Sequence, residues 1–150
     1  MTHVEVSGAA VTRFSRRDIG AFTRKVLLAL EHNGSLREPI SEVTIALVDD
    51  SAMRRLNRTF RHRNKTTDVL TFPADSSYAD PRSEARPLGD IVISVDQARR
   101  QAVQEKHSLG TEVRYLIVHG VLHALGYDHE SDNGEMNELE LEIRAAAGLD

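Results

Sequence analysis

The sequence predicts an α+β (mixed α/β) fold: one domain over residues 1–150, with a small mixed sheet of about four strands and about five helices. Three observations support this prediction. The length of 150 residues suits one domain, and neither a linker nor an internal repeat divides the chain. Apolar residues make up 40% and charged residues 28%, as in ordinary globular domains. Short β-branched runs alternate with longer segments whose apolar residues recur at helical spacing.

Two elements are predicted at the start of the chain. Residues 4–6 alternate between apolar and polar and predict a short strand. Ser15 is followed three residues later by Asp18, the spacing of a capping box, and this predicts the start of a helix. Apolar residues at helical spacing then continue until Asn33-Gly34, where we expect the helix to end.

The middle of the chain predicts a strand, a helix, a second strand and a long loop. Residues 43–48 (VTIALV) are typical of a buried strand, and Asp50 or Ser51 can cap the helix that follows. Residues 68–72 (DVLTF) predict the next strand, and residues 74–88 a polar surface loop of a length that is often functional. One face of the helix carries Met53, Leu56 and Phe60.

The last part of the chain predicts one strand and three helices. Residues 89–95 (GDIVISV) form the strand, and Asp96 can cap the helix after it. Thr111 can cap the helix over residues 112–125, which is the most apolar and is predicted to be central and buried. Gly126 can end this helix in the left-handed conformation. A final amphipathic helix carries Met136, Leu139, Ile143 and Ala146.

The composition excludes several classes of protein. The chain has no cysteine, so disulfides, cysteine zinc ribbons, iron–sulfur clusters and thiol nucleophiles are excluded. No apolar run approaches the ~18 residues that a membrane span needs, and no apolar signal segment is visible. We therefore expect a cytoplasmic protein that does not contact a membrane.

Charge is distributed unevenly along the chain. The net charge is −4 with a pI near 6.0, which gives no overall indication of nucleic-acid binding. Even so, a basic run on an acidic protein can form a local anion-binding face; the alternative is that both runs below are solvated helix faces. The basic run comprises Arg54, Arg55, Arg58, Arg61, Arg63 and Lys65, and the acidic run Glu130, Asp132, Glu135, Glu138, Glu140 and Glu142.

Three histidines have the spacing of a metal site. His119 and His123 lie one turn apart on the same helix face, so both imidazoles can reach one ion. Gly126 ends the helix, and His129 follows as a third ligand in the pattern H-x-x-x-H-x-x-G-x-x-H. Three neutral histidines suit Zn²⁺ at ~2.0–2.1 Å and leave a fourth position for water, which favours hydrolysis. The alternative is that these histidines are ordinary core or surface residues.

The residue after the first histidine decides between two hydrolases. The spacing resembles that of metzincin proteases, but Gly120 stands where those enzymes carry the glutamate that activates water. A protease interpretation therefore needs a displaced base from elsewhere in the chain. We hypothesise that Gly120 leaves room beside the metal for a bulky substrate such as a phosphodiester.

Residues 119–129 (HGVLHALGYDH) resemble the signature of the YbeY family of bacterial endoribonucleases, H-G-x-L-H-L-x-G-Y-D-H. The resemblance covers roughly residues 40–145. Ala124 replaces the usual Leu and Thr71 the common Ser, conservative changes that we expect to affect packing and not chemistry. The other blocks in family order are 56–60, Arg61, 67–73 (TDVLTFP) and 89–94 (GDIVIS).

The resemblance implies a function and its partners. It implies one Zn²⁺ per chain held by the three histidines, and zinc-dependent cleavage of single-stranded RNA in the cytoplasm. The implied roles are maturation of the 3′ end of small-subunit ribosomal RNA and ribosome quality control. The implied partners are ribosomal RNA and the small subunit, with a ribosomal protein or a ribosome-assembly GTPase as candidates and no DNA. Arg61 matches the arginine of the family's cleft and is the implied catalytic residue.

The residues themselves agree with phosphate chemistry. Arg61 can hold a scissile phosphate through two parallel hydrogen bonds, which Lys cannot do. Arg58, Arg63 and Lys65 can hold neighbouring phosphates without reading sequence. With four Phe and three Tyr, we expect no aromatic platform for stacking bases, which suggests that a partner delivers the RNA.

Two acidic residues have alternative roles. Asp128 either orients the adjacent His129 or caps the turn. Asp68 either holds Arg61 in place or begins a strand. At the level of the whole protein, two alternatives to the nuclease remain: a non-catalytic ribosome-binding factor with zinc in its core, and a metzincin-like protease with a displaced base.

Overall fold

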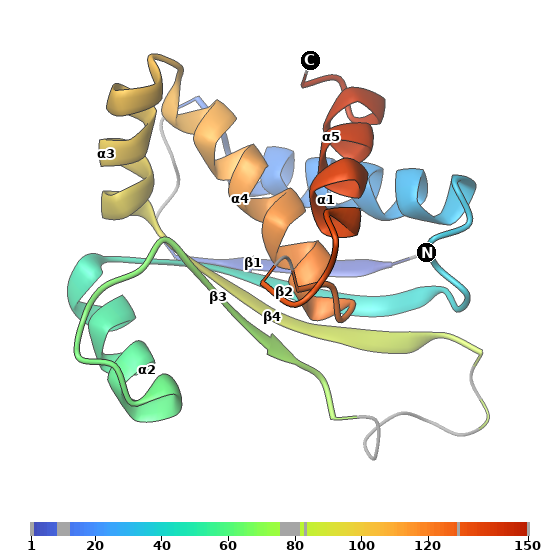
Figure 1. Ribbon diagram of the computed structural model, residues 1–150, viewed down its shortest axis with the longest axis horizontal. Coiled ribbons are helices and arrows are strands. Elements are labelled where there is room, and N and C mark those ends of the chain that lie inside the picture. Colours follow the sequence, from blue (N-terminus) through green and yellow to red (C-terminus); the bar gives the residue numbers. More distant parts are fainter. Residues whose placement is uncertain (1, 9–12, 76–81, 83, 129, 150) are drawn as a thin grey trace.

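The computed structural model describes residues 2–8, 13–75, 82, 84–128 and 130–149, which form four strands and five helices (Figure 1). This confirms the predicted α+β class. The strands are β1 (His3–Ser7), β2 (Ile40–Val48), β3 (Val69–Pro73) and β4 (Arg86–Ser94). The helices are α1 (Arg16–His32), α2 (Asp50–Arg61), α3 (Val95–Glu105), α4 (Leu109–Ala124) and α5 (Glu135–Ala146).

The strands form one mixed sheet in the order β1-β2-β4-β3. Strands β1, β2 and β4 are parallel, whereas β3 runs antiparallel to β4 and forms an edge. In the register, Ile91 of β4 lies between Ile45 of β2 and Thr71 of β3. Because side chains alternate along a strand, Ile91 and Ile93 enter the core on one face and Val92 the core on the other.

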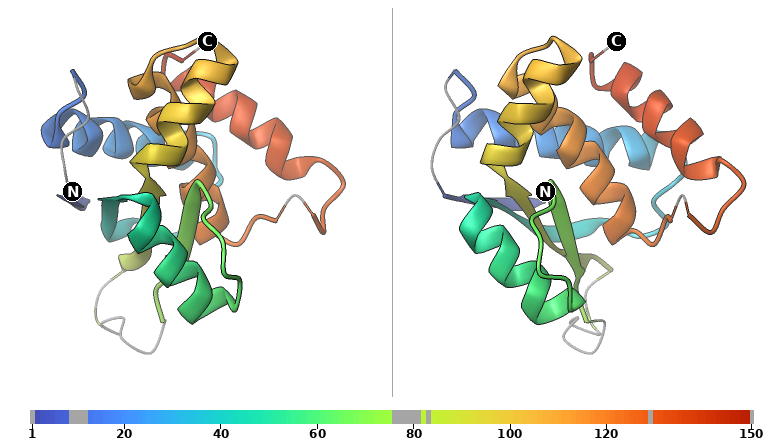
Figure 2. Two further views of the ribbon diagram at one scale, coloured as in Figure 1. Left: turned by 90° about the vertical axis from the view of Figure 1, so that its left-hand side faces the viewer. Right: turned by 60° about the vertical axis from the view of Figure 1, so that its left-hand side comes forward.

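The helices cover the two faces of the sheet unequally. Helices α1, α3, α4 and α5 lie on one side and α2 lies alone on the other (Figures 1 and 2). The larger core joins α1 and α4 to the sheet, with residues such as Leu30, Ile45 and Ile117 fully buried. The smaller core lies beneath α2 and is centred on Met53, Leu70 and Val92. No helix among the described residues has the length and apolar character that a membrane crossing requires.

Several predicted boundaries are shifted. The Ser15–Asp18 capping box of α1 is present as predicted, but three later helices begin before their predicted caps. In each case an earlier side chain accepts a backbone N–H of the first turn while its own backbone is still extended, so the helix starts sooner. The caps are Asp49 in place of Asp50 or Ser51, Ser94 in place of Asp96, and Ser108 in place of Thr111. Strand β4 begins at Arg86, so it includes residues 86–88, which were predicted to belong to the loop. Residues 76–81 and 83 of the predicted loop lie outside the described residues.

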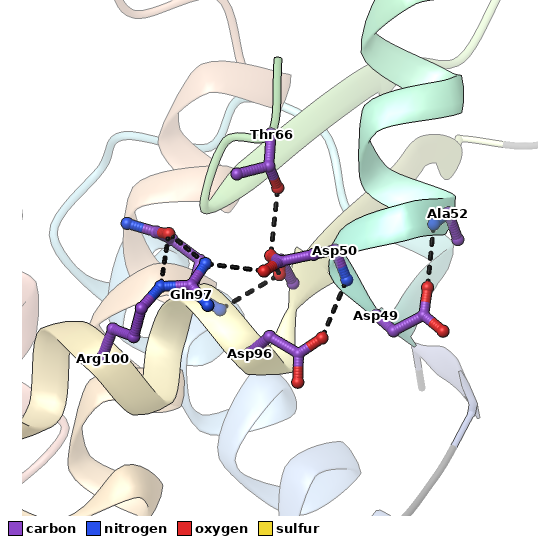
Figure 3. A network of polar contacts seen from close by, with 8 residues as sticks. Asp49, Asp50, Ala52, Thr66, Asp96, Gln97 and Arg100 are labelled. Carbon is purple, nitrogen blue, oxygen red and sulfur yellow. Dashed lines mark hydrogen bonds and ion pairs between the residues drawn. The ribbon is translucent and has the colours of Figure 1, made fainter.

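A polar network around Asp50 fixes the start of α2 against α3 and β4 (Figure 3). The Asp50 carboxylate accepts hydrogen bonds from Ser94 at 2.9 Å, Thr66 at 3.1 Å and Arg100 at 2.8 Å. Its backbone N–H donates to Asp96 at 2.9 Å. Burial raises the pKa of Asp50, but these hydrogen bonds and the Arg100 charge lower it more, so the net pKa is below its usual value. The ionised group stabilises the fold above its ordinary pKa, and this contribution is lost as the pH falls through the lowered value.

Gly120 allows α4 to lie close to the sheet. A Cβ atom at this position would lie 2.6 Å from Cγ2 of Ile91 and 3.4 Å from Cγ2 of Val69. Gly120 is buried and faces β3 and β4, not the open side of the helix. The hypothesis that it leaves room for a substrate is therefore wrong. Side chains of β3 and β4 already occupy the space beside Gly120.

This contact predicts the effect of Gly120→Ala. The added methyl group meets a stiff, buried β-branched side chain, and such overpacking costs about 1–3 kcal/mol. Because alanine gains about 1 kcal/mol of helix propensity, we expect a net loss of up to about 2 kcal/mol in the free energy of unfolding. Chemical denaturation followed by circular dichroism measures this loss.

Gly110→Ala on the same helix is the matched control. There the new Cβ meets the flexible end of Arg114 at 3.0 Å, which can move away, so the stability should change little or rise. In an Ile91→Ala background, Gly120→Ala should cost less than it does alone, because the clashing methyl group is gone. Equal stabilities of the two glycine variants would show that the close contact does not limit packing.

Candidate metal centre and cleft

A cleft of about 770 Å³ lies between the end of α4 and the edge strand β3. Its floor is formed by β3, and one wall by the end of α2 and the segment after it. The opposite wall is formed by the end of α4 and the turn beyond it. The lining includes Arg61, Arg63, Lys65, Thr71, His119, His123, Tyr127 and Asp128. The structure therefore brings together two separate predictions, the histidine pair and part of the basic run.

The histidine pair converges on one point. The Nε2 atoms of His119 and His123 lie 3.0 Å apart, and the two rings meet edge to face. The i, i+4 spacing places both rings on the cleft side of α4, while Gly120 occupies the sheet side. Both imidazoles are part-buried, so burial and the helix backbone restrict their orientation.

Glu140 of α5 holds the first of these rings. Its Oε1 lies 2.8 Å from Nδ1 of His119, and Nη2 of Arg144 lies 3.8 Å from its other oxygen. Burial raises the pKa of Glu140, but the hydrogen bond with His119 and the charges of His119 and Arg144 lower it more. The pKa is thus below its usual value, and an ionised carboxylate can only accept. His119 must therefore donate from Nδ1, which makes Nε2 of the neutral ring an acceptor that faces Nε2 of His123 at the cleft.

The chain turns sharply after α4. Gly126 has a φ of 102°, its N–H donates to the carbonyl of His123 at 2.9 Å, and the N–H of Tyr127 donates to that of Leu122 at 3.1 Å. These two bonds form a Schellman motif and confirm the predicted stop. Asp128 then accepts the N–H of Glu130 at 3.0 Å, as a turn cap does, while its alternative role of orienting His129 stays a prediction. The predicted third ligand, His129, lies outside the described residues.

Arg61 reaches the cleft from the opposite side. Its Nη2 donates to the carbonyl oxygen of Thr71 on β3 at 3.0 Å, so the side chain is held at the strand edge. Asp68 does not hold Arg61; its carboxylate accepts from Gln101 at 3.2 Å, just before β3 begins. Arg63 and Lys65 also line the cleft, as expected for groups that hold neighbouring phosphates. Arg58 is exposed on α2 and is not part of the lining.

The geometry of the pair fits a metal ion. Two nitrogen ligands at ~2.0–2.1 Å from a tetrahedral zinc ion stand about 3.3 Å apart, close to the observed 3.0 Å. A carboxylate on the far ring nitrogen, as supplied by Glu140, is the usual partner of a metal-ligating histidine. Within the described part of the chain, which omits His129, no three potential ligands gather at one point.

The profile of the family described as Endoribonuclease YbeY matches residues 7–148 of this sequence. The chain belongs to the YbeY endoribonuclease family. This agrees with the resemblance seen in residues 119–129 and in the blocks before them. The cleft lined by Arg61, His119 and His123 is thus a feature of a member of this family.

Individual YbeY relatives agree with the profile. The Endoribonuclease YbeY of Nautilia profundicola is 46% identical over 102 residues, 68% of this chain and 69% of its own length. That of Moorella thermoacetica is 46% identical over 117 residues, 73% and 74% of the two chains. That of Myxococcus xanthus is 43% identical over 136 residues, which cover 89% of this chain but 44% of the relative. The present chain therefore matches less than half of that longer protein.

A solved structure supports the fold alone. The solution structure of a protein from Thermotoga maritima matches with a TM-score of 0.61 at 22% sequence identity. The match covers 99% of this chain and 90% of the other. The fold of this chain is thus also found in a protein that shares 22% of its sequence.

The sequence analysis missed Glu140, although a signal was present. Glu140 belongs to the acidic run, which was interpreted only as a charged stretch. It lies four residues after Met136 and three before Ile143, both of which are buried, so it sits beside the apolar stripe of α5. A carboxylate at the edge of a buried face needs a partner, and here the partner is His119.

Glu140→Ala should change the tautomer of His119. In the wild-type chain, treated with a chelator and with the ring in its neutral form, we expect the proton mainly on Nδ1, because the Glu140 carboxylate accepts it. Without the carboxylate, the population should shift toward the Nε2–H form. Long-range ¹H–¹⁵N NMR spectra of the imidazole nitrogens measure this population. Glu138→Ala, an exposed position on the same helix, should leave it unchanged. A wild-type His119 protonated mainly on Nε2 would contradict the assignment.

Proposed function

We propose that this chain is a zinc-dependent endoribonuclease that cleaves single-stranded RNA. Its role is the maturation of ribosomal RNA, at the 3′ end of the small-subunit RNA, and ribosome quality control in the cytoplasm. Membership of the YbeY family supports the reaction class. The observation that carries the proposal is that Arg61 and the histidine pair open onto the same cleft.

His119, His123 and His129 would hold one zinc ion. When bound there, zinc supplies a Lewis acid and lowers the pKa of a bound water toward ~7. Glu140 keeps His119 in the tautomer that presents Nε2 to the cleft. The turn at Gly126 brings the chain toward the same region just before His129 in sequence.

Arg61 is positioned to bind the phosphate that is cleaved. Its guanidinium uses one N–H on Thr71, which leaves the remaining donors for two phosphate oxygens. In that position the fixed positive charge stabilises the negative charge that develops on those oxygens. Arg63 and Lys65 are positioned for the adjoining phosphates, and this binding weakens as salt rises.

The charges of the two walls predict which wall of the cleft the RNA backbone follows. The wall formed by Arg61, Arg63 and Lys65 is basic, whereas Asp128 and Glu130 line the opposite side. Phosphates are attracted to the first wall and repelled by the second, so the backbone should follow α2 and β3. A protease with a displaced base is less favoured, because the cations of the basic wall suit a phosphodiester better than a peptide. The ribosomal small subunit is the expected partner, with a ribosomal protein or an assembly GTPase as candidates.

The metal should bind with a stoichiometry that depends on His123. Elemental analysis of the purified wild-type chain should give about one zinc per chain, as one site of this type holds one ion. His123→Ala should lose most of the bound metal and the RNA cleavage. Its circular dichroism should stay native, because a metal ion in an open cleft does not hold the hydrophobic core together. His32→Ala, exposed at the end of α1, is the control. Unfolding of His123→Ala on metal loss would instead favour a structural zinc and a non-catalytic ribosome-binding factor.

Cleavage should depend on the shape of the Arg61 side chain as well as its charge. Arg61→Ala should lower kcat for a single-stranded RNA by about 10²–10³-fold, the usual cost of removing one donor that stabilises developing charge. Arg61→Lys should restore little, since an ammonium group cannot bind two oxygens in parallel. Arg99→Ala, exposed on α3, should retain wild-type rates. Chelator-sensitive peptide cleavage that is indifferent to Arg61→Ala would point to the protease instead.

A further inference from the structure

Phe60 is an apolar residue in an unexpected place. It shares a face of α2 with Met53 and Leu56, which predicts burial, and Met53 is fully buried. Yet Phe60 is 58% exposed, the one aromatic among the large exposed apolar residues of the described chain. The exposed fraction of these side chains thus rises along the helix, and the ring of Phe60 is accessible to solvent near its end.

The exposed ring is held in a fixed orientation. It meets the ring of Phe72 on β3 edge to face, with centroids 5.3 Å apart and an angle of 76° between the planes. The next residue, Arg61, binds the carbonyl of Thr71, the residue before Phe72. Two neighbouring contacts therefore join the end of α2 to the edge strand. Arg61 and Thr71 line the cleft, whereas Phe60 and Phe72 are not among its lining residues.

The surroundings of Phe60 favour a nucleobase over an apolar partner. Its exposed neighbours on α2 include Arg58 and Thr59, and the basic run from residue 54 to 65 contains no acid. A single ring among cations is too small for a protein-docking patch, which usually extends over a few hundred Å². An aromatic face with cations beside it is, however, the arrangement that binds single-stranded nucleic acid: bases stack and phosphates pair.

We propose that Phe60 is a stacking site for a base of single-stranded RNA that crosses the edge strand β3 as it leaves the cleft. The inference rests on the proposed function for its substrate class. It also replaces the expectation of no aromatic platform, which was based on the small number of aromatic residues and not on where they lie.

A single tryptophan at this position provides a direct probe. The chain has no Trp, so Phe60→Trp introduces the one indole of the protein and preserves the stacking face. Adding a single-stranded RNA oligonucleotide should quench its fluorescence, whereas a polyphosphate of matched charge, which has no bases, should not. A gel verifies that the oligonucleotide stays intact. Leu28→Trp on α1, a position of similar exposure at 54%, should respond to neither.

Removal of the ring should weaken binding without loss of the fold. Phe60→Leu should raise the Kd for single-stranded RNA about 5- to 150-fold, the range found when aromatic stacking is removed, while Phe60→Trp should stay near wild type. An abasic nucleotide at the contacted position of the RNA should abolish the difference between wild type and Phe60→Leu. Circular dichroism verifies that both variants are folded.

The outcomes separate this site from the proposed function. Equal quenching by RNA and polyphosphate, or an unchanged Kd for Phe60→Leu, would overturn the stacking site even if RNA is cleaved. Quenching by RNA alone, with no cleavage by the wild-type chain, would support the stacking site and count against the nuclease. No response to RNA would also overturn it.

Discussion

The close approach of α4 to the sheet at Gly120 is the constraint on which the site depends. With glycine there, the helix backbone rests against Ile91 and Val69. His119 and His123 then lie just above β3, whose Thr71 carbonyl holds Arg61. A larger residue would lift the helix and separate the two walls of the cleft. The glycine therefore acts through the backbone geometry, by bringing elements together rather than by opening space.

The parts of the fold that depend on periodicity were predictable from the sequence. Hydrophobic patterns identified the four strands and four of the five helices of the described residues, because an element must bury one face whatever its neighbours are, while the helix after β4 was predicted from its cap. The helix starts were displaced, since two capping side chains lay near each other and only the backbone angles select one, as with Asp49 and Asp50. Gly120 was misinterpreted for a related reason: spacing gives the angle between residues on a helix, but not which side meets the sheet.

The site was only partly predictable because its members come from distant segments. His119 and His123 are close in sequence, so their convergence follows from helical geometry. Glu140 comes from another helix, and its contact with His119 spans 21 positions. The exposure of the Phe60 ring likewise depends on how α2 packs against the sheet, which no local pattern contains. Long-range pairings such as these are fixed by packing.

The attachment of α2 has a consequence for how the cleft can respond to what it holds. The helix is tied at its start by the carboxylate of Asp50 and by the buried Met53, whereas its last turn rests on Phe72 and on one carbonyl. Local opening costs least where few apolar contacts must be broken. We therefore expect local opening to begin at the end of α2, while its beginning stays with the core. The histidine wall is thus anchored in the larger core, whereas the arginine wall belongs to the part of α2 that a few contacts at the strand edge hold in place.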